Sequence, residues 1–325
     1  MLRSLLGFDW RKSKAHLLLL SKFLHGETAQ AFAKADYWKE ALGETPQRAI
    51  ERLGREGVLV TAGLSEQLAY KYKVTELRDM LKQRGIPVSG RKDDLISRLV
   101  EADPGGMKKA VAGLTLLKCS ERGREIASLY LASKENEREA TERKVLEALQ
   151  NGKFREASLL ISSYEAAQVF SRGLGIDWKN YDSGRDVAML TLIFRSKPKI
   201  LARLDQRKLE PLRLAAGMKH LWGTGKAGAW LPADFETGLA MDNESAARMF
   251  MFFAAHQRDM KQYRELSKAG REYVVEIDTT DDQYRCEACR KLAGKSFRLN
   301  EVPELPYAEC TSEMGCRCMA LAKRL

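Results

Sequence analysis

The sequence is poor in histidine, and this scarcity excludes several kinds of active site. It contains four histidines in 325 residues, and the last of them, His256, precedes every cysteine of the C-terminal group. An HNH-type nuclease needs histidines beside its metal, and a zinc-dependent deaminase needs an H-x-E triplet before its paired cysteines. A cysteine nucleophile near the C-terminus would also lack a histidine to activate it. The sequence therefore offers no catalytic residue and argues against an enzyme.

Long apolar runs and nucleotide-binding motifs are also missing. No apolar run approaches the length of a bilayer-spanning helix. The leucine run at residues 17–20 is broken by Lys22 and lacks a small-residue cleavage site, which argues against a signal peptide. The GTGK stretch at residues 223–226 lacks the spacing of a P-loop and is not followed by Ser or Thr. We therefore predict a cytoplasmic protein that neither binds membranes nor hydrolyses nucleotides.

Positive charge is abundant. The chain has 55 Lys and Arg against 44 Asp and Glu, for a net charge of +11 and a pI near 9.3. With 44% hydrophobic residues, a chain of this length can bury two or three cores. The charge fits a polyanionic partner but does not identify it.

Residues 73–104 predict two short helices joined by an extended segment. In the first helix, apolar residues recur every three or four positions, and Gly85 suits its left-handed end. Pro87 pushes the residue before it out of helical geometry. The second helix is expected to begin near Ser89, a plausible N-cap whose first turn leaves backbone N–H groups free. The inward-facing residues are Val74, Leu77, Leu81, Leu95, Ile96 and Leu99.

Cations surround the expected start of this second helix, and such a helix terminus favours anions, of which duplex phosphate is the obvious polymer. The spacing of RGIPVSGRKDDLISRL resembles the SAP domain, a helix–extended–helix module that binds DNA. The resemblance covers about a tenth of the chain and implies weak, largely sequence-independent contact with double-stranded DNA. Its expected contact residues are Lys82, Arg84, Ser89, Gly90, Arg91, Lys92 and Arg98.

The charge balance of this hairpin limits its affinity. Residues 71–103 hold eight Lys and Arg against six Asp and Glu, a net charge of only +2, so the hairpin alone should bind feebly. The competing interpretation is a solvated helical hairpin whose cations only maintain solubility.

The segments around the hairpin predict an α/β unit spanning residues 1–132. Short strands are expected at residues 58–60 and 114–119, with a closing helix from about residue 124. This order resembles a winged helix that carries the SAP-like hairpin in its wing. A small α/β packing unit that merely presents the hairpin is an equal alternative.

Residues 133–270 predict a helical domain. An αα-hairpin is expected around Asn151 and Gly152, and no second copy at a fixed period supports a solenoid. A stripe of Leu212, Met218 and Trp222 is typical of a core. His256 has no cysteine or carboxylate one turn away, which favours a core or boundary position over metal binding.

Residues 271–325 hold five of the six cysteines. Two residues between Cys286 and Cys289 allow both sulfurs to reach one tetrahedral zinc ion. We predict a structural zinc site in a small α+β tail; its favoured ligands are Cys286, Cys289, Cys310 and Cys316, with Cys318 as the alternate. A disulfide or free-thiol arrangement is the competing interpretation. Nearby carboxylates suit a charged turn better than a catalytic metal site, namely those of Asp278, Asp281 and Asp282.

The tail is also similar to the C-terminal module of phage head-morphogenesis proteins related to the Mu minor head protein. The similarity departs from that group where its members place a histidine before the C-R-C run, since Cys310 is the nearest candidate here. It implies a small metal-binding fold more than a capsid role. The shared residues are Cys286, Cys289, Leu292, Gly294, Lys295, Phe297, Pro303, Pro306, Cys316, Arg317 and Cys318.

These observations predict a mainly α, multidomain protein with a winged-helix-like α/β N-terminal unit, an inserted SAP helix-extended-helix, a helical middle and a small zinc-binding α+β tail. The predicted function is non-catalytic binding of double-stranded DNA, with structural zinc and a possible protein partner at the helical middle or the tail. The alternatives are a phage-derived head-morphogenesis or structural protein and, less favoured, a metal-dependent nuclease.

Overall fold

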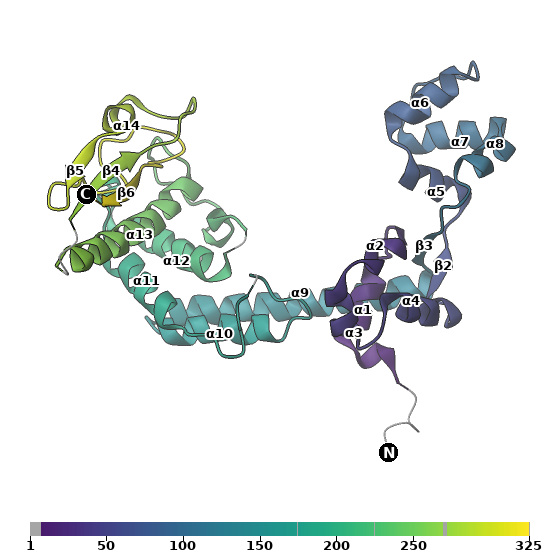
Figure 1. Cartoon of the computed structure of the whole chain (residues 1–325), viewed down its shortest axis with the longest axis horizontal. Helices are drawn as coiled ribbons and strands as arrows, with labels where there is room; N and C mark the ends of the chain where they lie inside the picture. Colours follow the sequence, from purple (N-terminus) through teal and green to yellow (C-terminus); the bar gives the residue numbers. More distant parts are fainter. Residues whose placement is uncertain (1–7, 174, 224, 269–271, 325) are drawn as a thin grey trace. The chain divides into compact units, whose positions relative to one another are not determined.

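The computed structural model describes residues 8–173, 175–223, 225–268 and 272–324. These residues are mainly helical and include two small antiparallel sheets, as predicted (Figure 1). The chain divides into two compact units, Met1–Glu137 and Arg138–Leu325. The predicted boundary between residues 270 and 271 lies outside the described residues.

The N-terminal unit builds its frame from short helices and a three-stranded sheet. The sheet has the order β1-β3-β2, and β3 pairs antiparallel with both neighbours. Thr45 caps α4, accepting a hydrogen bond from the Arg48 amide at 3.4 Å, and Pro46 occupies the first helical position. The elements are η1 (Trp10–Lys12), α1 (Lys14–Ser21), β1 (Glu27–Thr28), α2 (Gln30–Ala33), α3 (Asp36–Leu42), α4 (Pro46–Arg55), β2 (Leu59–Thr61) and β3 (Leu116–Cys119).

Four helices lie in the connection between β2 and β3 (Figure 1). They are α5 (Leu64–Lys71), α6 (Val74–Lys82), α7 (Lys92–Ala102) and α8 (Pro104–Ala110). The two helices predicted from the apolar spacing are α6 and α7. They bury one leucine-rich core in which Leu68, Leu77, Leu81, Leu95 and Leu99 are fully buried. Burial of this stripe holds the hairpin together.

The helical part of the second unit continues from α9 (Glu121–Gln150), which spans the boundary between the units. The Asn151–Gly152 turn joins α9 to α10, as expected for an αα-hairpin. The predicted stripe Leu212, Met218 and Trp222 is buried, and His256 is 9% exposed. The remaining elements are α10 (Phe154–Ala166), α11 (Gly184–Arg195), η2 (Lys199–Leu201), α12 (Gln206–Trp222), η3 (Ala227–Trp230) and α13 (Asn243–Lys268).

The cysteine-rich end of the chain forms the second sheet, with the order β5-β4-β6. The central strand β4 (Tyr273–Asp278) pairs antiparallel with β5 (Ser296–Arg298) and β6 (Met319–Arg324). A single helix, α14 (Glu287–Leu292), lies between β4 and β5 in sequence. Val275 and Ile277 of β4 are fully buried in the core that also contains residues of α12 and α13. The tail is thus packed into its unit through one face of β4.

Candidate nucleic-acid interface and candidate metal centre

Three of the cations expected to contact DNA are engaged inside the hairpin. Arg84 pairs with Asp103, with 2.7 Å between Nη2 and Oδ2. The Lys92 ammonium donates to the Ala69 carbonyl at 2.5 Å and so ties α7 to the last turn of α5. Arg98 donates to the carbonyls of Pro87, Ser89 and Asp94. These side chains hold the hairpin together, a use that the sequence did not indicate.

Two other predicted cations face solvent. The Arg91 side chain is exposed, and among the described residues its guanidinium forms no hydrogen bond or ion pair. Lys82 forms an exposed ion pair with Asp79, with 3.5 Å between Nζ and Oδ1, which is too open and long to immobilise the ammonium. Arg91 and Lys82 therefore remain accessible to a phosphate.

The predicted cap of α7 is wrong. Arg91, not Ser89, is the N-cap residue, and its amide donates to the Asp94 carboxylate at 2.8 Å. Asp94 stands at the third position of the helix, where an acidic side chain reaches back to the N-cap amide. Part of the helix N-terminus that we expected to be free is thus satisfied by the protein's own carboxylate. The signal in the sequence was the acid three residues after Arg91.

Asp103 supports the other end of the hairpin. Hydrogen bonds from Arg84 and from the Gly106 amide lower the pKa of its carboxyl below the ordinary value. The Gly106 amide lies 2.7 Å from Oδ1, so that Asp103 also caps α8. One carboxylate thereby joins the end of α6 to the start of α8.

The five C-terminal cysteines come together at one place, as the sequence predicted. Two sets of sulfur atoms each lie within 4.8 Å of one another, namely Cys286, Cys289 and Cys310, and Cys289, Cys316 and Cys318. The sulfurs of Cys286 and Cys310 are 3.7 Å apart. Two thiolates bound about 2.3 Å from one tetrahedral zinc ion would lie about 3.8 Å apart. The spacing fits a shared ion, and Cys289 belongs to both sets.

Backbone amides favour the ionised form of two of these thiols, Cys286 and Cys316. The Tyr307 amide donates to the Cys316 sulfur at 3.1 Å. Burial opposes ionisation of Cys286, but hydrogen bonds that include the Cys289 and Thr311 amides outweigh it and lower its pKa to about 7. Cys119, which lies outside the group, shows the opposite behaviour, because burial raises its pKa to about 11. Within the group, hydrogen bonds to Cys289 lower the pKa of Cys310 and Cys318, but hydrogen bonds to Cys316 and burial outweigh them and raise it to about 12. The ionised form is thus favoured at Cys286 and Cys316 and not at every clustered thiol.

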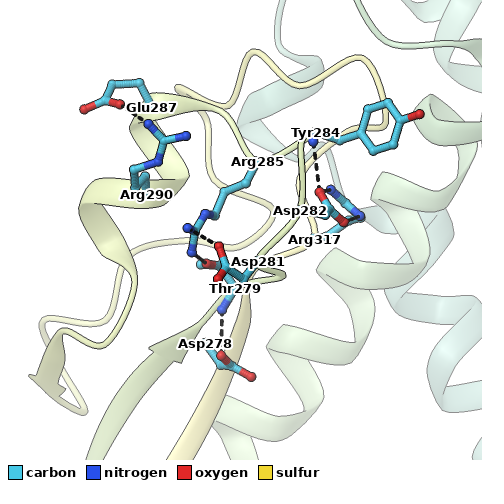
Figure 2. Close-up of polar contacts among 9 residues, drawn as sticks. All are labelled: Asp278, Thr279, Asp281, Asp282, Tyr284, Arg285, Glu287, Arg290 and Arg317. Carbon is cyan, nitrogen blue, oxygen red and sulfur yellow. Dashed lines mark hydrogen bonds and ion pairs between the residues drawn. The ribbon is translucent and has the colours of Figure 1, made fainter.

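Two arginines line the small cavity that contains four of these cysteines. Figure 2 shows both arginines, Arg285 and Arg317, with the aspartates that pair with them. Arg317 makes a bidentate ion pair with Asp282, both contacts being 2.6 Å, and stacks 5.9 Å from the centre of the Tyr284 ring. Arg285 pairs with Asp281 at 2.5 Å. The two carboxylates balance the charges of the two guanidinium groups beside the cysteines. Asp281 and Asp282 hold arginines here, as expected of a charged turn rather than of a catalytic metal site.

Residues 71–104 match the SAP domain family. This segment is a SAP domain. No curated protein matches the chain, and no solved structure does. The similarity of the tail to phage head-morphogenesis proteins thus gains no support from these comparisons.

The SAP domain carries further exposed cations that the sequence analysis did not single out. Arg78 on α6 faces solvent, and so does Lys73, the residue directly before α6. Lys108 on α8, which lies outside the matched segment, is exposed as well. They are distinguished from the internal cations only by their position in the folded hairpin. Within the described ranges, no helix is long and apolar enough to cross a bilayer.

Proposed function

We propose that this protein binds double-stranded DNA through its SAP domain, without catalysis and without reading base sequence. The proposal is carried by the SAP match at residues 71–104, and the exposed guanidinium of Arg91 in the loop before α7 supports it. The small net charge of the hairpin, together with the internal use of three cations, makes the contact weak, and the phosphate contacts that remain make it fall with rising salt.

The frame that carries the SAP domain is proposed to be winged-helix-like. This is supported by its order of helix, strand, helices and two strands, by the sheet order β1-β3-β2, and by the insertion of the SAP domain between β2 and β3. In such a frame α4 is the helix placed to meet DNA, and its Arg48 and Arg55 are exposed. A second contact of this kind would add to the affinity of the SAP domain.

The C-terminal cysteines are proposed to hold one structural zinc ion. Thiolates select zinc over magnesium or calcium, and four of them close the coordination sphere. Cys286, Cys289 and Cys310 are supported as ligands by their mutual proximity. Cys316 is the favoured fourth ligand because its sulfur accepts a hydrogen bond from the Tyr307 amide, and Cys318 is the alternate. When bound, the ion would cross-link residues on both sides of α14 and β5, while the thiolates and their amide donors fix the loops.

The test of DNA binding is a titration of the full-length, zinc-loaded protein against fluorescent duplexes of unrelated sequence, followed by anisotropy over a series of salt concentrations. We expect similar affinities for all duplexes and a linear fall of log K with log salt. The Arg84, Arg91 and Lys92 triple alanine variant should bind at least tenfold more weakly. A matched control is Arg290→Ala, which removes an exposed cation of the tail.

Absence of binding to any duplex at low salt would overturn the proposal. The phage-structural alternative predicts self-association or capture by a portal-like assembly that ignores the three substitutions. Mass photometry on the same samples distinguishes the two outcomes, because it reports oligomers directly.

A further inference from the structure

We propose that Arg98 is a positioning residue which turns two backbone amides of the SAP loop toward solvent, and that these amides and Arg91 contact the DNA phosphate. The inference deepens the proposed DNA binding and rests on it. It also reassigns two of the cations predicted to touch DNA, since Arg98 and Lys92 act inside the domain.

Two carbonyl groups of the extended segment between α6 and α7 accept hydrogen bonds from Arg98. The two terminal nitrogens of Arg98 donate to the carbonyls of Pro87 and Ser89, while its Nε donates to the Asp94 carbonyl at 3.2 Å. The carbonyls of Pro87 and Ser89 therefore both point toward one guanidinium. One planar cation sets the orientation of two peptide groups.

The geometry of the peptide unit fixes the direction of the N–H groups that follow these two carbonyls. The only cis bond in the described chain is Leu305–Pro306, so that the peptide groups following Pro87 and Ser89 are trans. In a trans peptide group the N–H points opposite to the C=O. The N–H groups of Val88 and Gly90 consequently point away from Arg98, and neither donates to an acceptor in the described chain. They are available to an outside acceptor.

Gly90 fits against Arg98. Gly90 has φ of +112°, a conformation that residues with a side chain rarely adopt. A Cβ at this position would lie 2.9 Å from the Arg98 Nη2 atom and equally close to the Asp94 carboxylate. A side chain here would be strained by the positive φ and would displace the guanidinium or the carboxylate from its place. The Ser89–Gly90 pair is therefore required for its backbone, and the Ser89 hydroxyl has no part in the arrangement.

Arg91 is the charged partner. Arg91 follows Gly90 directly, and its exposed guanidinium has no partner among the described residues. Residues 88–91 thus supply two N–H donors and one mobile cation, which suits a single phosphate oxygen group. The Asp94 carboxylate accepts a hydrogen bond from the Arg91 amide. Its negative charge would repel a phosphate bound to residues 88–91 and so weaken that contact. Lys92 is directed to Ala69 and does not take part.

The test compares four single variants of the full-length protein in the duplex titration: Arg91→Ala, Arg98→Lys, Arg98→Ala and Ser89→Ala. Arg91→Ala should weaken binding three- to tenfold and reduce the slope of log K against log salt by about one, with an unchanged melting temperature. Ser89→Ala should bind within twofold of the parent protein.

Arg98→Lys decides the positioning role, because it keeps the charge but cannot span two carbonyls in a fixed plane. We expect a three- to tenfold loss of affinity with the salt slope retained, together with lower NMR backbone order parameters at residues 88–90, because the loop is no longer held by one planar cation. Arg98→Ala should do the same with a lower melting temperature. If it unfolds the hairpin, the lysine variant still carries the test.

Wild-type affinity for both Arg91→Ala and Arg98→Lys, with the parent protein binding DNA, would overturn this inference alone. A loss at Ser89→Ala as large as that at Arg91→Ala would also overturn it, because the hydroxyl would then make the contact. Failure of the parent protein to bind any duplex would instead overturn the proposed function.

Discussion

The SAP domain and the cysteine-rich tail solve the same problem of size in different ways. Each is too small to be stabilised by a large apolar core. The SAP domain buries leucines from α5, α6 and α7. The tail instead places Cys289, Cys310, Cys316 and Cys318 in the buried positions around α14. The first region can fold by burying hydrocarbon, whereas the second gathers in its interior closely spaced thiols that could hold a metal ion.

The two regions also use charge in a similar way. In the SAP domain, Asp103 holds Arg84. In the tail, Asp281 and Asp282 hold Arg285 and Arg317 beside the thiols. In both regions arginines are engaged by carboxylates of the same chain at partly exposed positions. Net charge therefore overstates how many cations face a polyanion, and the folded position of each residue decides its role.

The largest expected effect is that of metal removal, which should separate the two regions. Chelation in the presence of a reductant should release zinc and abolish the amide protection of β4 and β6. Structural zinc contributes about 10–16 kcal/mol in small zinc-finger peptides, and packing of β4 on the helical core should retain only part of this fold. DNA binding by the SAP domain should persist. Hydrogen exchange with mass spectrometry measures both regions in one experiment.

The cysteine variants give the matched control for this prediction. Cys289→Ser should lose the metal, because its sulfur belongs to both sets of clustered thiols. Cys119→Ala should retain one ion per chain, because Cys119 is buried in the other unit. Retention of full zinc content by Cys289→Ser would contradict the proposed centre.

The SAP domain can be destabilised without affecting the cysteine-rich tail. Leu99→Ala removes a fully buried side chain from the SAP core and should destabilise this domain by about 2–5 kcal/mol. Duplex binding should fall with the loss of the folded domain, while zinc content stays unchanged. Val100→Ala, on the same helix and only partly buried, is the control and should cost less. Thermal denaturation and metal analysis provide the two readouts.

The smallest expected effect is a difference in acid sensitivity. Arg84 lowers the pKa of Asp103, so its stabilising contribution is present above the ordinary value of 3.8 and is lost as pH falls through the lower folded value. The tail should respond at higher pH, since protons compete with zinc for thiolates. Asp103→Asn should remove the acid-dependent step of the SAP domain and leave that of the tail. NMR can follow the acid transition of each region in the parent protein. If the SAP domain and the tail unfold at the same pH, the expected order, in which the tail responds at higher pH, is wrong.

Local sequence patterns were sufficient for the helices of the SAP domain and for the existence of the cysteine group. The three- and four-residue spacing of leucines in residues 74–99 predicted α6 and α7, since a helix returns to the same face at that interval. The clustering of five cysteines between residues 286 and 318 predicted that their sulfurs meet. Both patterns are local properties of the chain.

Tertiary structure decided which polar groups are used internally. Arg84 finds Asp103 at a separation of 19 residues, and Lys92 finds Ala69 at 23, and no periodicity in the sequence predicts such partners. The N-cap of α7 is Arg91 and not the predicted Ser89, because Gly90 turns the chain at its positive φ and the Asp94 carboxylate accepts a hydrogen bond from the Arg91 amide. The sequence alone determined where apolar side chains and thiols gather. Only the folded chain determined which cations remain for a partner, because a hydrogen bond depends on distance and direction in space.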